Sequence, residues 1–211
     1  YFIASREKPL VVVPALGHLC TVVQEHGRKS IYPVFEFKWA PRYLAEKDAY
    51  KIMAWIDVFS KLAAEADDFI DACDYDTEGA TIGYTILKYA CNNKENTAKR
   101  MKYSTLTRTE LEKSYEEKMP HLDFAMVEAG LTRHEVDWLY GVNLSRALMS
   151  SIREAGRFKI MSIGRVQGPA LNFIVERERK ILAFSPQKYW QIFIRVKNSH
   201  ELELKYNRDI F

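Results

Sequence analysis

Three carboxylates stand at alternate positions in one short run of this chain, at Asp74, Asp76 and Glu78. The run follows a short, mostly apolar stretch at 69–73 and leads into a helical pattern at 81–90. In open α/β sheets, ligands bind at the carboxyl ends of buried strands, which is where this run would lie. Carboxylates crowded together repel one another unless a hard cation such as Mg2+ sits among them. The run therefore indicates a metal site in an α/β fold.

Two other interpretations of the acidic run are an exposed surface turn and a calcium-binding EF-hand loop. The alternating acids and Gly79 in the sixth position fit an EF-hand. Its twelfth position would be Thr85, however, where a bidentate Glu is required, and a strand precedes the run instead of a helix. The surface turn stays open. An extended backbone would direct the three carboxylates to one side, because Tyr75 and Thr77 alternate with them, and this geometry favours the metal site.

Short apolar stretches alternate with helical patterns in the first part of the chain. The expected strands are 10–16, 69–73 and 101–104, and the expected helices are 45–66, 81–90 and 107–118. Residues 24–39 are irregular and predict loops or short strands. Thr107 and Glu110 have the spacing of a capping box. Strands that alternate with helices predict an α/β fold with a parallel sheet flanked by helices.

The pattern changes at Pro120, and we place a domain boundary there, between residues 1–120 and 121–211. Two long helical patterns follow, 124–152 (with interruptions at Gly130 and Gly141) and 165–184. Alternating residues at 189–196 and 201–206 predict two strands joined by a turn at Asn198 and Ser199. The second part is therefore expected to be mainly helical, with a short β-hairpin.

Composition excludes several classes of protein. Apolar residues make up 47% of the 211 positions and charged residues 28%, which is ordinary for a globular protein. The formal charge is only +3, so a nucleic-acid partner must be bound by a local basic face. Cys20, Cys73 and Cys91 are widely spaced among apolar neighbours, as in reduced, buried thiols of a cytoplasmic protein. No apolar run approaches the ~18 residues of a membrane span, and no signal peptide is recognisable.

The second part carries polar groups that suit phosphate. Arg133 and Asp137 are four positions apart on one helical face, and guanidinium groups form forked hydrogen bonds to phosphate oxygens. In the run 162–168, a glycine-containing turn leads into a helix and places Ser162, Arg165 and Gln167 beside free backbone N–H groups. A solvated ion pair for the first group and an ordinary helix cap for the second are the alternatives.

Several of these runs together resemble motifs of type IA DNA topoisomerases. The run 74–79 resembles the second acidic motif of TOPRIM domains. The other matching runs occur in the family's order: Gly17-His18-Leu19, Arg133 to Gly141, Ser162 to Gln167, Val175 to Glu178 and Phe184 to Trp190. The resemblance spans nearly the whole chain and is strongest to archaeal or topoisomerase III-like members. It implies a TOPRIM domain, with its first strand and glutamate missing, followed by part of a helical single-stranded-DNA-binding domain.

The resemblance also implies roles for individual residues. Asp74, Asp76 and Glu78 would hold Mg2+ beside the scissile phosphate. Arg133 and Asp137 would lie near the active site, with Arg133 binding DNA and Asp137 orienting it. The remaining DNA-binding positions would be Ser162, Arg165, Gln167 and Arg100. The family changes DNA topology by transient cleavage and resealing of one strand through a phosphotyrosine.

The chain departs from the family pattern at several positions. Ser104 to Thr107 replaces an Asn-Glu-Ile-Thr motif, Thr77 stands where Arg is common, and Ala80 where Glu is common. No tyrosine has the expected context before an Arg-Thr-Asp-Ser run, and the first TOPRIM glutamate would precede Tyr1. We therefore expect a piece of a longer protein, inactive alone, that binds Mg2+ and single-stranded DNA weakly.

Two rival functions remain at this stage. One is another TOPRIM enzyme, such as a primase or a nuclease, which also uses clustered acids with a metal but lacks the motif of Ser162 to Gln167. The other is a non-catalytic nucleic-acid-binding module whose acids form a surface turn. The expected setting is the cytoplasm, on DNA and without a membrane partner, as a monomer.

Overall fold

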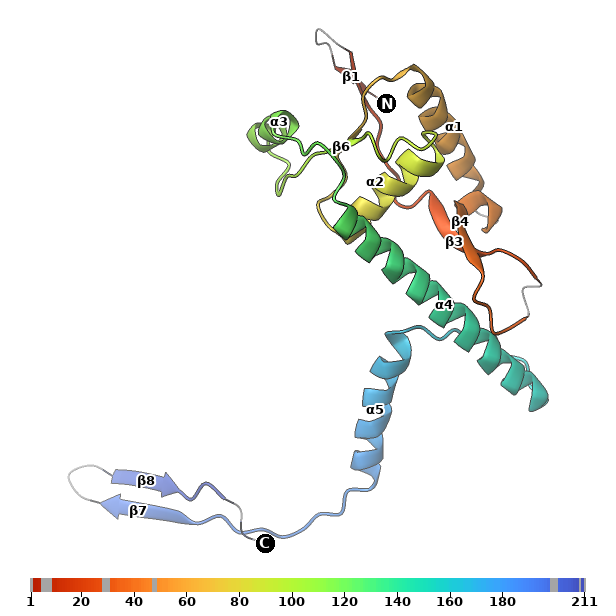
Figure 1. The fold of residues 1–211 in the computed structure, drawn as a ribbon. Coiled ribbons are helices and arrows are strands. Elements are labelled where there is room, and N and C mark those ends of the chain that lie inside the picture. Colours follow the sequence, from red (N-terminus) through yellow and green to blue (C-terminus); the bar gives the residue numbers. More distant parts are fainter. Residues whose placement is uncertain are drawn as a thin grey trace. The chain divides into compact units, whose positions relative to one another are not determined.

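The computed structural model describes residues 2–4, 9–27, 31–46, 49–197, 201–208 and 210. It divides into two units, residues 1–165 and 166–211, and each is described by itself. The first unit holds the acidic run and most of the candidate site. The second unit holds one helix and a hairpin (Figure 1).

The described strands of the first unit form three separate pairs. β1 (Phe2–Ala4) pairs antiparallel with β2 (Leu10–Val12), and β3 (Cys20–Gln24) pairs antiparallel with β4 (Phe37–Pro41). β5 (Ile70–Asp71) pairs in parallel with β6 (Lys99–Arg100), and α2 makes the crossover between them. The expected α/β class is confirmed. Among the described strands, however, parallel pairing is limited to this one βαβ unit.

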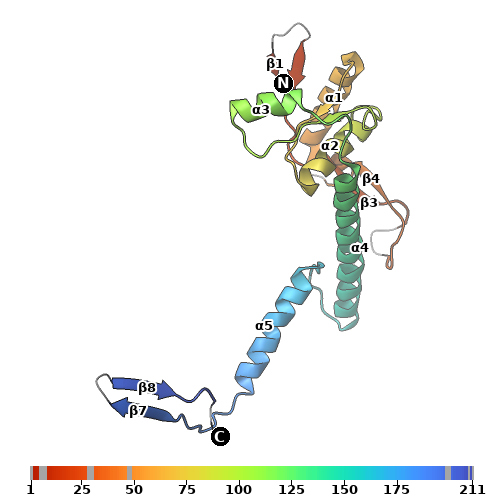
Figure 2. The same cartoon turned by 60° about the vertical axis from the view of Figure 1, so that its left-hand side comes forward.

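Within the described residues, the first unit also contains four helices and a short 3-10 turn. They are η1 (Arg42–Leu44), α1 (Tyr50–Glu65), α2 (Thr77–Tyr89), α3 (Arg108–Glu116) and α4 (Phe124–Glu154). α2 lies inside the unit, and the first part of α4 crosses it and packs against its N-terminal turns (Figures 1 and 2). Its apolar face, including Ile86, joins Leu19, Ala63 and Cys91 in the main core. Burying this face fixes the N-terminus of α2, which carries the acidic run.

Several local expectations need correction. The strand expected at 10–16 ends at Val12, and the strand expected at 101–104 is instead the preceding pair, Lys99 and Arg100. Thr107 caps α3 by position, but its side chain makes no capping hydrogen bond, so no capping box forms with Glu110. The segment 24–39, for which loops or short strands are expected, does contain short strands: Gln24 at the end of β3 pairs with Phe37 at the start of β4.

α4 runs without interruption for 31 residues, although its sequence contains Gly130 and Gly141. Gly130 lies against α2: a Cβ added there would stand 2.0 Å from Thr81 Oγ1 and 2.6 Å from the Thr77 carbonyl oxygen. Gly141 has far more room, with the nearest atom, the Ile163 carbonyl oxygen, at 3.7 Å. Gly130 therefore permits close helix packing instead of breaking the helix.

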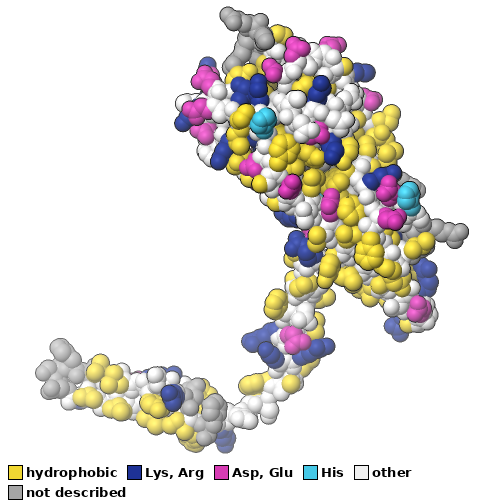
Figure 3. Space-filling model, in the orientation of Figure 1, with side chains coloured by type: hydrophobic (Ala, Val, Ile, Leu, Met, Phe, Trp, Pro, Cys, Tyr) yellow, Lys and Arg dark blue, Asp and Glu magenta, His cyan; other side chains and the backbone are white. Residues whose placement is uncertain are grey.

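The second unit begins at Val166 and contains α5 (Gln167–Leu182), β7 (Phe193–Lys197) and β8 (Glu201–Lys205). β7 and β8 pair antiparallel, which confirms the expected hairpin strands, while the predicted turn at Asn198 and Ser199 lies outside the described residues. Basic and acidic side chains gather midway along α5 (Figure 3), where Arg179 pairs with Glu176. The domain boundary near residue 120 stays a prediction.

Candidate active site

The acidic run forms the turn that joins β5 to α2. Asp76 caps α2, because its Oδ1 accepts a hydrogen bond of 2.7 Å from the Gly79 backbone N–H. The Asp76 N–H in turn donates to the Asp74 carbonyl oxygen at 2.9 Å. Gly79 is required here, since a Cβ would stand 2.0 Å from that carbonyl oxygen. The expected extended backbone is thus wrong: the run is a turn and a first helical turn, and the helix begins at Thr77.

Arg100 supports this turn from the interior of the protein. Its side chain is 1% exposed, and its guanidinium donates to three carbonyl oxygens, those of Asp71 (3.2 Å), Cys73 (2.7 Å) and Asp74 (2.7 Å). It also lies 3.3 Å from Asp71 Oδ1 in a buried ion pair. This placement does not support the expected contact between Arg100 and DNA, because the guanidinium presents no surface to a phosphate. Its observed role is to position the acidic turn.

Asp71 is a buried acid that the sequence interpretation missed. Burial raises the pKa of its carboxyl above the ordinary value, while Arg100 and the Cys73 backbone N–H act in the opposite direction. Its carboxylate also occupies the space beside Gly83, where a Cβ would approach it to 2.3 Å. The signal was present in the sequence, since Asp71 stands alone in an apolar strand and a buried charge requires a partner.

Glu78 is the meeting point of α2, α4 and the segment before β3. Its Oε2 lies 2.9 Å from His18 Nε2 and 3.1 Å from His134 Nε2, while its Oε1 lies 3.3 Å from Arg133 Nη1. Burial opposes ionisation of Glu78, but hydrogen bonds from His18 and His134 outweigh it and lower the pKa of the carboxyl. The sequence had placed His18 in a motif without assigning it a contact, and His134 had gone unassigned.

Arg133, Asp137 and Arg165 continue this polar surface along α4. The Arg165 Nε donates to Asp137 Oδ1 at 2.6 Å, and Arg133 Nε lies 4.0 Å from Asp137 Oδ2. The hydrogen bond from Arg165 lowers the pKa of the Asp137 carboxyl, and nearby Arg133 acts in the same direction. All three side chains are about half exposed. The structure thus brings together three of the expected site residues from two motifs, with Asp137 and Arg165 28 positions apart.

The loop before Arg165 is anchored on α4 by Ser145, which sequence analysis did not identify. Its hydroxyl accepts a hydrogen bond of 2.9 Å from the Ile163 N–H. Ser162 lies in this loop and is exposed. Gln167 is also exposed and begins α5 in the second unit. Contacts of Ser162 and Gln167 with DNA stay a prediction.

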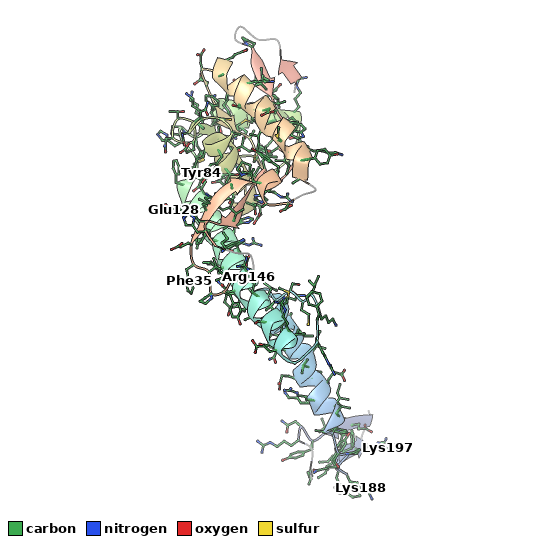
Figure 4. All side chains as sticks on the ribbon, turned by 90° about the vertical axis from the view of Figure 1, so that its right-hand side faces the viewer. Phe35, Tyr84, Glu128, Arg146, Lys188 and Lys197 are labelled. Atoms are coloured by element: carbon green, nitrogen blue, oxygen red, sulfur yellow. The ribbon has the colours of Figure 1, made fainter. Side chains whose placement is uncertain are left out.

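A second loop is held on α4 by Asn143 and Arg146. The Asn143 side chain accepts from the Val34 N–H and donates to the Val34 carbonyl, and Arg146 donates to the Ile31 carbonyl at 2.7 Å. Figure 4 shows Phe35 and Arg146 at the level where this loop meets the helix. These contacts fix the strand β4 that carries Trp39, whose indole donates to Glu135 on α4 at 2.9 Å.

The two aspartates of the run face a groove of about 720 Å3 between the turn and α3. Both are exposed, and within the described residues no hydrogen bond or ion pair engages the Asp74 carboxylate. Tyr75, Tyr103 and Lys102 also line the groove. Among the described residues, one group has all its potential ligand atoms within 4.8 Å of one another: His18, Glu78 and His134. The two aspartates do not belong to this group.

Two family models match the segments that carry these residues. The Toprim domain model matches residues 4–106, and the DNA topoisomerase model matches residues 121–210. The acidic turn therefore belongs to a Toprim domain, and the arginine-bearing helix to a topoisomerase segment. The chain belongs to the family of type IA DNA topoisomerases.

Similar proteins come from archaea and bacteria. The chain is 45% identical over 211 residues to DNA topoisomerase 1 of Pyrococcus horikoshii and 42% identical over 213 residues to that of Methanocaldococcus jannaschii. The two matches cover 99% and 98% of this chain, but 31% and 28% of those relatives. DNA topoisomerase 3 of Pasteurella multocida is 32% identical over 168 residues, which cover 78% of this chain and 25% of that relative. The matches thus span about a quarter to a third of the length of these relatives. No helix within the described residues is long and apolar enough to cross a membrane.

Proposed function

We propose that this chain is the part of a type IA DNA topoisomerase that holds a divalent metal and one DNA strand at the reacting phosphate. In the whole enzyme this part would serve Mg2+-dependent transient cleavage and resealing of that strand. The observation that carries the proposal is the junction at Glu78, where the acidic turn of the Toprim segment meets Arg133 of the topoisomerase segment at 3.3 Å. The turn proposed to bind the metal and the helix face proposed to bind phosphate are therefore in contact within one unit.

The proposed metal ligands are Asp74, Asp76 and Glu78, with Mg2+ as the ion. Carboxylate oxygens are the donors that Mg2+ prefers, and the ion retains several waters, which suits exposed side chains beside an open groove. Asp76 uses Oδ1 for the helix cap, so Oδ2 is the atom it would offer. Glu78 would have to exchange one of its present partners for the ion. When bound, the metal would supply positive charge beside the scissile phosphate.

The proposed DNA contacts are the arginines and polar groups along α4 and the loop that follows it. Arg133 and Arg165 are half exposed and point to the same carboxylate, Asp137. Asp137 would orient both guanidinium groups for a phosphate, since an arginine held in place loses less rotational freedom on binding. Ser162 and Gln167 would add neutral hydrogen bonds to the backbone of a single strand. The nucleophilic tyrosine would come from outside these 211 residues, so we expect no cleavage by this chain alone.

The rival functions are less well supported. A primase or a nuclease would account for the Toprim match but not for the topoisomerase match over residues 121–210. A non-catalytic module would not require Arg100 to hold the acidic turn in a fixed shape. We propose that the protein acts on DNA in the cytoplasm, as a monomer.

Metal binding can be tested on the 211-residue chain by following thermal melting and tryptophan fluorescence during titration with Mg2+. Trp39 is a local reporter, since its ring lies 5.8 Å from the His134 ring. Asp74→Asn with Asp76→Asn should abolish the Mg2+ response, and Asn retains the helix cap at position 76. The matched control is Asp57→Asn, which removes an exposed charge from α1. An unchanged response in the double variant would exclude these aspartates as ligands.

A further inference from the structure

Three side chains meet at one point of the first unit in a way that the proposed Mg2+ chemistry does not require. His18 comes from the segment before β3, Glu78 from the first turn of α2 and His134 from the middle of α4. The potential ligand atoms of the three residues all lie within 4.8 Å of one another. Both imidazoles direct Nε2 at the same carboxylate oxygen, Glu78 Oε2, at 2.9 and 3.1 Å.

The donor set differs in kind from the set proposed for Mg2+. Two imidazole nitrogens and one carboxylate oxygen are ligands that suit Zn2+ and similar transition-metal ions, whereas Mg2+ prefers oxygen and retains its water. Three protein ligands leave a fourth tetrahedral position for water, as in catalytic zinc sites. The ligand chemistry of the cluster therefore favours Zn2+ and similar ions, which are borderline between hard and soft, over the hard ion Mg2+.

The spacing also suits such an ion. For ligand distances of about 2.0–2.1 Å, neighbouring donors of a tetrahedral site stand about 3.3 Å apart, close to the two separations observed here. The rings are already oriented: His18 and His134 contact edge to face with centroids 4.6 Å apart, and Trp39 packs on His134. His18 Nδ1 is buried with no hydrogen-bond partner among the described residues, so the imidazole makes its polar contact at Nε2 alone.

Arg133 is the group that opposes a cation here. Its Nη1 lies 3.3 Å from Glu78 Oε1, the carboxylate oxygen that the imidazoles do not use. The side chain is 55% exposed and has a second acceptor nearby, with its Nε 4.0 Å from Asp137 Oδ2. An arriving ion could therefore displace Arg133 toward Asp137 without leaving a buried charge unpaired.

We propose that His18, Glu78 and His134 form a binding site for a single borderline divalent ion of the Zn2+ type. Because Glu78 also belongs to the proposed Mg2+ ligands, an ion held by the two histidines withdraws it from that set. This second statement, that the two ions exclude one another, rests on the proposed function. Zinc would then act as an inhibitor of the Mg2+ site.

The site can be tested by isothermal titration of the 211-residue chain with Zn2+, and by the visible absorption of Co2+ as a spectroscopic substitute. One ion should bind per chain, with a cobalt spectrum of nitrogen and oxygen ligands. His134→Ala and Glu78→Gln should each lower the affinity by at least about tenfold. His26→Ala and His121→Ala, which remove exposed histidines elsewhere, should leave it unchanged. Circular dichroism of each variant ensures that a loss of binding is not a loss of fold.

Arg133→Ala gives a change of opposite sign, because removing a neighbouring positive charge should tighten Zn2+ binding. Equal affinity in wild type, His134→Ala and Glu78→Gln would overturn the site, as would a cobalt spectrum with thiolate charge transfer, which would assign the ion to cysteine. Saturating Zn2+ should suppress the Mg2+ melting shift in wild type but not in His134→Ala. If Mg2+ gives no shift in any variant while Zn2+ binds as described, the proposed function fails and the zinc site stands.

Discussion

Arg165 and Asp137 join the loop before α5 to the middle of α4 through two hydrogen bonds, from Nε to Oδ1 at 2.6 Å and from Nη2 to Oδ2 at 3.4 Å. The pair is a forked contact of a planar guanidinium with a carboxylate, the geometry that gives arginine its directional preference. It determines where the Arg165 charge stands on the surface. Both side chains are over two-fifths exposed, so the pair contributes little to the stability of the folded chain. Its main effect is to orient the Arg165 side chain.

Removing Arg165 should change the titration of Asp137. The Arg165 hydrogen bond holds the pKa of the Asp137 carboxyl below its ordinary value, so the charged form is favoured in the folded chain. Any stability from the pair is then complete above the unfolded pKa of about 3.9 and is lost as the pH falls through the folded pKa. Arg165→Ala should return the Asp137 pKa toward its ordinary value, as measured by carboxyl 13C chemical shifts. Arg133→Ala should do so less, because Arg133 lies farther away at 4.0 Å.

Arg165→Ala should also weaken binding of a labelled single DNA strand, because one phosphate contact is lost. Fluorescence anisotropy at several salt concentrations should show lower affinity and a salt slope reduced by roughly 0.7, the value for one phosphate of a single strand. Arg108→Ala is the matched control, since Arg108 is 89% exposed on α3 and its ion-pair partner among the described residues is its neighbour Glu112. The same loss in both variants would show a general charge effect instead of a specific contact.

Replacing Arg100 should destabilise the chain strongly. Arg100→Met leaves the buried Asp71 carboxylate without its charged partner and removes one donor from each of three carbonyl oxygens, at a cost of about 3–5 kcal/mol. Urea unfolding followed by circular dichroism measures the change. Lys99→Ala, next to it, removes an exposed pair with Asp68 and should cost less than about 1 kcal/mol. If Arg100→Met proved as mild as Lys99→Ala, the buried pair would have no structural role.

The two glycines of α4 should respond in opposite directions to alanine. Gly130→Ala should destabilise by about 1–3 kcal/mol, because its Cβ would overlap the Thr77 carbonyl on the rigid backbone of α2. Gly141→Ala should stabilise by up to about 1 kcal/mol, because the added Cβ finds room and alanine favours the helix. Thermal melting of the two variants decides the matter, and stabilisation by both would contradict the close contact of α2 with α4.

The cysteines should react slowly with thiol reagents in the native chain. Burial raises the pKa of Cys20 to about 11 and that of Cys91 to about 11, and burial followed by the charge of Asp71 raises the pKa of Cys73. At pH 8 few of these groups are thiolates, which are the reactive form. Labelling should accelerate as the pH rises toward 11 and should be complete at neutral pH only in denaturant. Rapid labelling of Cys20 and Cys91 in the native chain at pH 8 would contradict their burial.

Much of the local structure could be predicted from residue pattern. The helices α1, α2, α4 and α5 and the hairpin strands follow from the helical or alternating pattern of residues, which is a local property. The helix α3 was expected from a capping box that does not form. The association of Arg133 with Asp137 also needed only a spacing of four on a helix. The acidic turn was harder, because Asp76 could continue a strand or cap a helix, and the hydrogen bond to Gly79 favoured the cap.

The sequence by itself determined the family, the order of the elements and the identity of most charged groups at the site. Tertiary structure alone decided which of those groups meet. His18, Glu78 and His134 lie far apart along the chain, and their contact depends on α2 packing against α4 at Gly130. The tertiary structure also decided the different roles of the arginines. Arg100 is buried and supports the acidic turn, whereas Arg133 and Arg165 lie on the surface. Periodicity along one chain carries no information on such distances, because they are set by how the elements pack.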